Sequence, residues 1–451
     1  MRKPTHKILN GLVALAMALA AVVTAHAATV NHSSAASLPT FRVVNWVSPD
    51  LALASTLDPA QVTDVYASAV INDIQAGLVQ LNSRTQVQKN LATKIKLSKN
   101  HKSYTFTIRS AKFSNGDPVT AQDFVYSIRR ALAHKTASPV NYYDSLITGY
   151  AKYTAGTSSR LGVKAINAHT LQINISKPAP YFLDALAYAN NDVLDPKVEK
   201  AHNAGTAKNY MTEHCAANVG AGPFKMVCAG KGAGPSSFYH GTHQYTLVPN
   251  PNYFGPKPKI KLELTVAGTS ETAYNEYLAG QVDAVGVPSD HLSKYLHKKN
   301  AQFHDVLTSA ISYTSLNTTA PPFNNSNCRK AYAYGINRVD MAKVIKYENR
   351  PYYEILPSAF LGYFKPSGVP TDNMAKAKTL FAACGAAGKT AFKLVYAAGG
   401  SDSDKIADTE AATAKAIGFN ETAEPLQLND WDSVITQALS KTGTIAVEQG
   451  W

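Results

Sequence analysis

The chain has 451 residues, of which 45% are hydrophobic and 17% are charged. This length is too great for one ordinary hydrophobic core, so we expect two or three domains. The formal net charge is +13, but Lys and Arg are scattered rather than grouped in blocks. Scattered cations favour a solvated surface, with at most a loose attraction to an anionic membrane or wall, over a nucleic-acid site.

The N-terminal residues predict a targeting segment. Arg2, Lys3 and Lys7 precede an apolar run from Leu9 to Val23, and Ala25-His26-Ala27 supplies a small-x-small cleavage pattern. We therefore expect residues 1–27 to be a signal peptide that is cleaved after Ala27. No Cys stands directly after the apolar run, which argues against a lipid-modified cysteine. An uncleaved anchor is the alternative, although the run is short for a span of about 20 residues.

The next elements follow from local patterns. Phe41–Val47 predicts the first strand, and Tyr66–Leu78 predicts a helix. Tyr104, Phe106 and Ile108 alternate with polar residues, which indicates a strand with one buried face.

Residues 111–139 (AKFSNGDPVTAQDFVYSIRRALAHKTASP) predict a tight turn followed by a helix. Asn115-Gly116 tolerates positive φ, and Pro118 keeps the preceding residue extended. Thr120 fits the helix N-cap, with Asp123 three residues later in a capping-box arrangement. Val119 and Phe124 would flank the cap as a hydrophobic staple. Helical spacing gives the predicted buried face, which comprises Ala121, Phe124, Ile128, Ala131 and Leu132.

Two further strands and a late strand complete the coarse prediction. Val163–Ile166 and Leu171–Ile175 alternate in polarity and are joined by an Asn-Ala-His turn, so they predict a hairpin. Gly443–Val447 predicts a strand near the C-terminus.

Four cysteines remain after the apolar run. An even number in an exported chain predicts two disulfides, for which three pairings exist. Cys215 and Cys228 bracket a short Gly-rich segment and would form a local bond. Cys328 begins one helical pattern and Cys384 ends another, so a bond between them would join two helices. Four free buried thiols are the alternative, and the absence of a CxxC pair argues against zinc.

Catalytic signatures are missing from the chain. There is no GxSxG elbow, HExxH helix, Walker loop or paired Cys–His signature. His240 and His243 have HxxH spacing, but in a Gly/Ser-rich loop without a third ligand we expect exposed histidines. We expect no enzyme activity, no cofactor and no metal site.

The segment FSNGDPVTAQDFVYSIRRAL, followed by KTASP, resembles the signature of the extracytoplasmic peptide-binding proteins of ABC importers, in particular their oligopeptide branch. Ile128 departs from that signature, which usually has Trp there. Further landmarks follow in the family's order: Leu57-Asp58-Pro59, residues 220–224 (GAGPF), residues 249–254 (PNPNYF), residues 276–283 (EYLAGQVD) and residues 322–338.

The resemblance implies a mixed α/β fold of the two-lobed periplasmic-binding-protein type, class II, with an extra domain. It implies a first part of lobe I at residues 28–80, the extra domain or lobe II at 81–200, and a second part of lobe I at 201–290. Residues 291–451 would be an incomplete lobe III, because the family pattern continues beyond Trp451. The expectation is a truncated chain.

The function implied by the resemblance is capture of a peptide outside the membrane and delivery to an ABC permease. The protein would be a monomer that meets the membrane through its transporter. Two alternatives stay open: a same-fold binder of a nickel chelate, haem or sugar, and a secreted receptor or scaffold without transport.

Matched positions imply the ligand-binding residues. Residues 63–65 would lie on a strand against the peptide, and the tyrosines after KTASP would line the cleft. Glu448 replaces an Arg of the branch. Each aromatic residue could instead belong to an ordinary core. The candidates are Thr63, Asp64, Val65, Tyr142, Tyr143, Tyr313, Trp431, Glu448, Gly450 and Trp451.

Overall fold

The structure is a computed structural model of the chain. It separates Met1–Pro39 from Thr40–Trp451, and the second part holds all the elements given below. The described residues are 38–47, 56–63, 65–201, 211, 214–228, 244–296, 302–304, 311–344, 351–354, 356, 363–365, 367–397, 402–426 and 445–450. Within them, three separate clusters of buried hydrophobic side chains form three cores.

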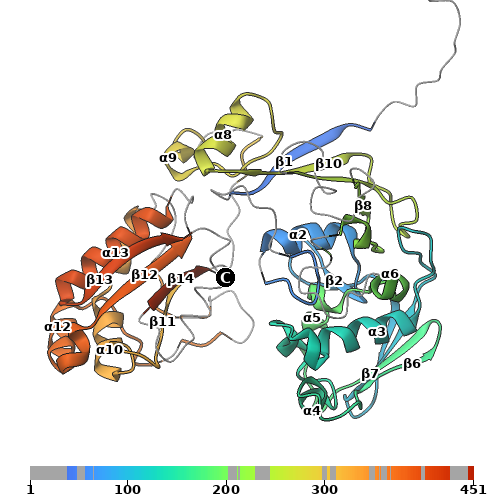
Figure 1. The fold of residues 1–451 in the computed structure, drawn as a ribbon, viewed down its shortest axis with the longest axis horizontal. Coiled ribbons are helices and arrows are strands. Elements are labelled where there is room, and N and C mark those ends of the chain that lie inside the picture. The colour runs from blue at the N-terminus through green and yellow to red at the C-terminus, as the bar shows by residue number, and fades with distance from the viewer. Residues whose placement is uncertain are drawn as a thin grey trace, which may run out of the picture. The chain divides into compact units, whose positions relative to one another are not determined.

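The first core lies on a four-stranded sheet of order β1-β10-β9-β8 (Figure 1). The strands are β1 (Thr40–Val47), β8 (Phe224–Met226), β9 (Gln244–Pro249) and β10 (Lys261–Ala267). Strands β1 and β10 are parallel although more than 200 residues separate them, and the other two pairs are antiparallel. Helix α2 (Val65–Ile74) contributes Ala67, Val70, Ile71 and Ile74 to this core.

The prediction that α2 continues to Leu78 is wrong. Gly222 donates its backbone N–H to the carbonyl of Ile74, and the carbonyl of Leu78 accepts the N–H groups of Asn90 and Ala92. The backbone at the end of α2 thus bonds to distant segments instead of continuing the helix. After four intervening residues β2 (Val79–Leu81) begins, and it pairs with β3 (Val87–Lys89).

The second core lies on an antiparallel sheet of order β4-β5-β7-β6. The strands are β4 (Ala92–Leu97), β5 (Ser103–Ile108), β6 (Val163–Asn167) and β7 (Thr170–Asn174). Tyr104, Phe106 and Ile108 are buried and alternate with less buried residues, as their pattern predicted. The predicted hairpin is confirmed as β6 and β7.

Helix α3 (Ala121–Leu132) packs on β6 and β7. Gly116 has φ of 98°, which confirms the turn before the helix. The Asp123 carboxylate accepts the backbone N–H of Thr120 at 2.8 Å and its hydroxyl at 2.9 Å, so the start of the helix is fixed as expected. The five side chains predicted for the buried face are all 0–2% exposed.

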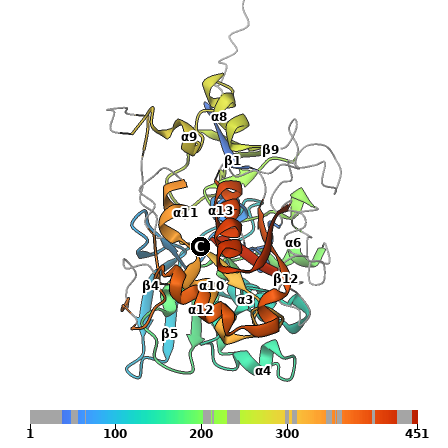
Figure 2. The same cartoon turned by 90° about the vertical axis from the view of Figure 1, so that its left-hand side faces the viewer.

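The third core lies on a mixed sheet of order β11-β14-β12-β13. Its strands are β11 (Ser312–Leu316), β12 (Ala391–Ala397), β13 (Asn420–Leu426) and β14 (Ile445–Gly450). The late strand therefore runs on to Gly450, because its pairing with β11 continues to that residue. Figures 1 and 2 show α12 (Met374–Ala382) and α13 (Ser403–Ile417) on one face of the sheet, with α10 (Ser326–Gly335) packed against both.

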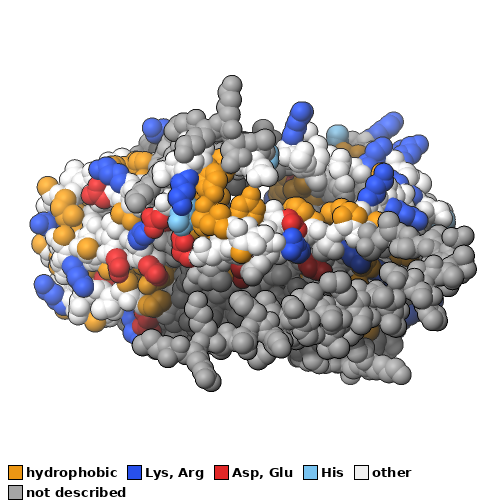
Figure 3. Space-filling view, turned by 90° about the horizontal axis from the view of Figure 1, so that it is seen from above, with side chains coloured by type: hydrophobic (Ala, Val, Ile, Leu, Met, Phe, Trp, Pro, Cys, Tyr) orange, Lys and Arg blue, Asp and Glu red, His pale blue; other side chains and the backbone are white. Residues whose placement is uncertain are grey.

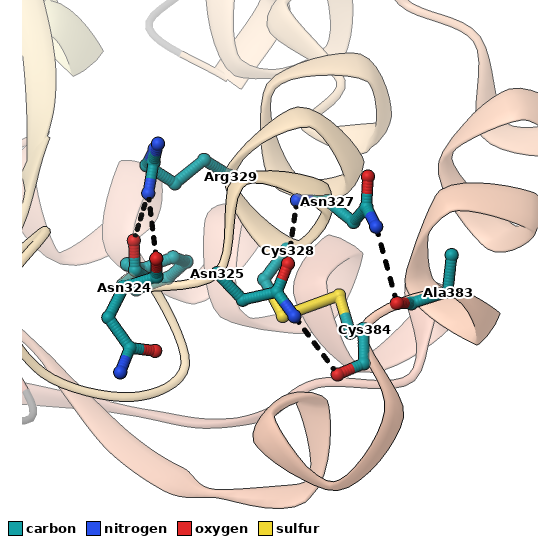
Figure 4. The surroundings of a disulfide bond; sticks show 8 residues. Asn324, Asn325, Asn327, Cys328, Arg329, Ala383 and Cys384 are labelled. Carbon is teal, nitrogen blue, oxygen red and sulfur yellow. Dashed lines mark hydrogen bonds between the residues drawn. A yellow bond between two sulfur atoms is a disulfide. The ribbon is translucent and has the colours of Figure 1, made fainter.

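Both expected cysteine pairs are bonded in the structure. Cys215 and Cys228 have Cα atoms 5.7 Å apart, and Cys328 and Cys384 have Cα atoms 5.2 Å apart. Figure 4 shows polar contacts around the second bond, where Asn325 donates to the carbonyl of Cys384 at 3.2 Å. Asn325 also caps α10 by accepting the N–H of Asn327, so one side chain serves the ends of two helices.

Short helices complete the described part of the chain. None of its helices has the length and apolar character that crossing a membrane requires.

On the face seen in Figure 3, Lys and Arg side chains are spread over the described surface, with Asp and Glu between them. The short helices are η1 (His134–Thr136), η2 (Asn141–Asp144), α4 (Tyr150–Thr154), α5 (Phe182–Ala185), η3 (Ala189–Asn191), α6 (Pro196–Ala201), η4 (Cys215–Ala217), α8 (Ser270–Leu278), α9 (Ser289–Leu292), α11 (Arg338–Val344) and η6 (Gly385–Lys389).

Candidate functional site

Three tyrosine rings lie in a row beside the first core, and this group is called the stack below. Tyr142 and Tyr143, both in η2, have ring centroids 4.5 Å apart and are tilted by 31° against each other. The ring of Tyr143 stacks in turn on Tyr188, with centroids 4.4 Å apart and an interplanar angle of 22°. Tyr142 is 54% exposed, whereas the other two are half-buried. Burial raises the pKa of Tyr143, so its hydroxyl stays protonated. The stack offers an apolar surface with polar edges, which suits a ligand of varied side chains.

A buried carboxylate fixes the stack. Asp144 is fully buried and accepts hydrogen bonds from the amide nitrogens of Asn190 at 2.7 Å and Asn191 at 3.1 Å. Because Asp144 ends η2 and the two asparagines belong to η3, these bonds fasten one short helix to the other. Burial raises the pKa of Asp144 to about 7, and the two amide donors oppose that rise. The ring of Tyr143, the residue before Asp144, is thereby held against Tyr188, which immediately precedes η3.

The stack is joined to the loop before α2. The Tyr188 hydroxyl donates to the carbonyl of Val62 at 3.3 Å, directly before the predicted site residue Thr63, which is exposed. Val65 is 70% exposed. The expectation of a strand at residues 63–65 is wrong at Val65, which is the first residue of α2. Asp64 lies outside the described residues.

A buried ion cluster anchors the same loop to the second core. Two nitrogens of the Arg130 guanidinium bond both carboxylate oxygens of Asp58, at 2.9 and 2.5 Å. Arg130 Nε lies 2.9 Å from an oxygen of Glu199 on α6, and the side chains of all three residues are at most 6% exposed. Burial raises the pKa of Glu199 to about 7, against the attraction of Arg130. Two segments that resembled family landmarks, residues 57–59 and α3, thus meet in one polar contact.

The segment after α3 strengthens this anchor. The Thr136 hydroxyl donates to the carbonyl of Arg130 at 2.6 Å, and the amide of Gln61 donates to the carbonyl of Thr136 at 2.5 Å. Residues 135–139 (KTASP) therefore connect the helix to the loop that carries Val62 and Thr63.

The remaining predicted residues form a second group on the third core. Tyr313, on β11, is half-buried and pairs in register with Gln449 of β14. Glu448 and Gly450 pair with Thr314 and Ser312 on the same two strands. Trp431 and Trp451 lie outside the described residues.

Sequence reasoning missed the residues that build and anchor the first group, which are Tyr188, Asp144, Asn190, Asn191, Arg130 and Glu199. The adjacent asparagines within a mostly apolar segment, residues 182–194, were a usable signal, because buried amides usually serve a polar partner. Arg130 was missed because a charged residue is normally assigned to the exposed face of a helix. Among the described residues, no group of three or more His, Cys, Asp or Glu side chains is placed to hold a metal ion.

Comparison with known sequences gives a match along most of the chain. A sequence model of the bacterial extracellular solute-binding proteins, family 5 Middle, matches residues 86–448. The oligopeptide-binding protein OppA of Bacillus subtilis (strain 168) is 32% identical over 336 residues, which are 70% of this chain and 58% of that protein. The periplasmic murein peptide-binding protein MppA of Escherichia coli (strain K12) is 30% identical over 351 residues, 73% of this chain and 61% of that protein. The chain spans about six tenths of the length of these relatives.

Comparison with solved structures agrees with the sequence match. Haemophilus influenzae OppA in complex with RPPGFSPFR has a TM-score of 0.77 and 22% identity to this chain, covering 92% of this chain and 80% of that chain. This likeness confirms the predicted α/β fold of the two-lobed periplasmic-binding-protein type.

Proposed function

This chain belongs to the bacterial extracellular solute-binding proteins of family 5, and from that premise we propose that it binds peptides outside the cytoplasmic membrane and delivers them to an ABC transporter permease. The observation that carries the proposal is the continuous family match over residues 86–448. The two relatives described above are named as peptide-binding proteins.

The proposed ligand surface combines the two groups of site residues. The stack of Tyr142, Tyr143 and Tyr188 supplies apolar area at little loss of side-chain entropy, so it accepts many side chains. Backbone groups beside Thr63 and on β11 would hold the peptide main chain, which gives affinity without selecting a sequence. No catalytic group is required for this function, and we propose that the protein is not an enzyme and carries no cofactor.

In this proposal, lobe I comprises residues 28–80 and 201–290, lobe II residues 81–200, and lobe III the residues from 291 onward. Residues 1–27 act as a cleaved export signal, and the mature protein works as a monomer. It binds no nucleic acid, and its contact with the membrane is through the permease.

Native mass spectrometry of the purified protein tests the ligand class. A ladder of peptide masses bound to the protein supports peptide transport. A single nickel chelate, haem or sugar mass would assign a different solute to the same fold. An empty protein that also fails to bind a mixed tri- to pentapeptide set in calorimetric titration would point to a receptor or scaffold.

A pair of tyrosine variants tests the ligand surface. Tyr142→Ala removes the exposed ring of the stack and should weaken peptide affinity about tenfold, which corresponds to about 1.4 kcal/mol. Tyr181→Ala is the matched control, because Tyr181 is similarly exposed, at 57%, but lies outside the stack. Equal affinities of the two variants would remove the stack from the binding surface.

A further inference from the structure

The third core contains a buried acidic pair that the proposed ligand surface does not use. Glu410, on α13, is 2% exposed, and its carboxylate accepts the Tyr332 hydroxyl at 2.6 Å. It also accepts the Thr314 hydroxyl, which lies 2.8 and 2.9 Å from its two oxygens. Glu421, on β13, is 0% exposed, and the charge of Glu410 disfavours its ionisation.

The two carboxylates differ in how well an ionised form is supported. Burial raises the pKa of Glu410, but its two hydroxyl donors oppose that rise and favour the charged state. Neither oxygen of Glu421 has a hydrogen bond of normal geometry within the described residues, although the nearby Tyr332 hydroxyl lowers its pKa somewhat. A proton shared by the pair is therefore best placed on Glu421.

The surrounding cations do not neutralise a second charge. The charged groups acting on the pair are Arg338 of α11, which acts on Glu410, and Lys415 of α13, which acts on Glu421. Arg338 is already paired with Asp372 at 2.9 Å, and Lys415 is exposed. Two buried like charges without a committed counter-ion do not ionise together, so the pair retains one proton.

The acidic pair is connected to the ligand surface through one strand. Thr314, which is bonded to Glu410, lies on β11 beside Tyr313 and pairs with Glu448 of β14. The Thr314 hydroxyl thus ties β11 to a buried carboxylate of the third core.

We propose that Glu410 and Glu421 hold a single proton inside the third core, and that the loss of this proton loosens β11 and weakens ligand binding. The effect on ligand binding rests on the proposed peptide function, whereas the proton held by the two carboxylates does not. Burial and the neighbouring Glu410 raise the pKa of Glu421 to about 8. Between about pH 4.5 and pH 8 the folded protein keeps a proton that the unfolded chain releases. The contribution of this proton to the free energy of unfolding is therefore complete below about pH 4.5 and is lost as the pH rises toward 8.

The first test compares the wild type with Glu421→Gln, which imitates the protonated side chain at every pH. Urea unfolding from pH 5.5 to 9 should show a wild-type unfolding constant that rises by up to tenfold per pH unit below pH 8, relative to the variant. Glu424→Gln is the matched control, because Glu424 lies on the same strand but is half-exposed and paired with Lys393. The control should keep the wild-type pH dependence. Identical pH dependence in wild type and Glu421→Gln would overturn the shared proton.

The second test follows β11 itself. Hydrogen exchange of residues 312–316, corrected for the intrinsic effect of pH, should accelerate at least fivefold in the wild type between pH 6 and pH 9 but not in Glu421→Gln. Titration with a tripeptide at the same two pH values should show a matching loss of affinity in the wild type alone. If the pH effect on exchange differs between wild type and Glu421→Gln but no peptide binds at either pH, the proposed function fails while the shared proton stands. If the exchange is the same in both proteins, the coupling to β11 is wrong.

A third variant guards against misfolding of Glu421→Gln. Glu410→Gln removes the neighbouring charge and should move the pH transition of unfolding to lower pH, because Glu421 then ionises more easily. An unmoved transition would contradict the pairing of the two carboxylates.

Discussion

Asp144 shows how one residue sets the geometry of a surface that it does not itself form. Its carboxylate is fully buried, yet it holds η2 to η3 and so places Tyr143 on Tyr188. Burial of the carboxylate raises its pKa to about 7, and the two amide donors oppose that rise.

Replacing Asp144 by Ala should destabilise the protein by about 1–3 kcal/mol, because two buried amides lose their acceptor. Asp144→Asn should be milder, since one amide oxygen can still accept a bond. Chemical denaturation checks both values.

The same variants give a pH test at this residue. The folded pKa of Asp144 lies above its unfolded value, so its contribution falls as the pH rises from about 4 to 7. Asp144→Asn should remove that part of the pH dependence. A variant that keeps the full wild-type slope would show that Asp144 does not titrate in this range.

At the scale of elements, the start of α3 depends on a local cap. Thr120→Ala removes the hydroxyl that bonds the Asp123 carboxylate and should destabilise the protein by about 1 kcal/mol. Ligand affinity should barely change, because the cap serves folding. A large loss of affinity at unchanged stability, measured by titration and thermal unfolding, would place this helix start in the binding surface.

The end of α2 depends instead on a distant glycine segment. A Cβ atom on Gly222 would lie 2.6–2.7 Å from backbone atoms of residues 73–75, and one on Gly220 would lie 1.9 Å from the Ile74 carbonyl oxygen. Glycine at these positions lets the chain cross directly over the helix end and lets Gly222 bond Ile74.

Gly222→Ala should therefore lower the free energy of unfolding by about 1–3 kcal/mol, because backbone cannot move aside as a side chain does. Gly286→Ala is the control, since a Cβ there meets nothing within 4 Å. Its effect should stay within about 0.5 kcal/mol. Similar results for both variants in urea unfolding would mean that the crossing adjusts freely.

At the scale of the whole molecule, the first and second cores are joined by the cluster of Asp58, Arg130 and Glu199. Asp58→Asn should cost about 3–5 kcal/mol, because it leaves the buried guanidinium poorly compensated. Asp117→Asn makes the same chemical change in an exposed pair with Lys197 and should cost no more than about 1 kcal/mol. Urea unfolding of both variants measures the contrast, and equal losses would show that burial adds nothing here.

The two disulfides tie the chain at larger distances, across 13 and 56 residues. Non-reducing peptide mapping of protein from an oxidising compartment should link Cys215 to Cys228 and Cys328 to Cys384. Breaking either bond should destabilise the protein by about 2–5 kcal/mol. Four alkylatable thiols in such a preparation would rule out both bonds.

The sequence by itself determined those features that depend on neighbours along the chain. The Asn115-Gly116 turn, the start of α3, its buried face and the alternation in β5 all arise from residues within a few positions of one another. The long family-like segments also pointed to the fold, because many landmarks occurred in one order.

Only the tertiary structure decided features that depend on partners far away in sequence. It ended α2 at Ile74, paired β1 with β10, and buried Arg130, Asp144 and Glu421 where charge alone predicts exposure. It also joined the tyrosines after KTASP to the loop at Val62 through Tyr188, 126 residues further along the chain from Val62. A buried polar group is tolerated only when other segments supply its hydrogen bonds or when it stays protonated and neutral. The local sequence does not show which segments will meet, so it does not predict such burial.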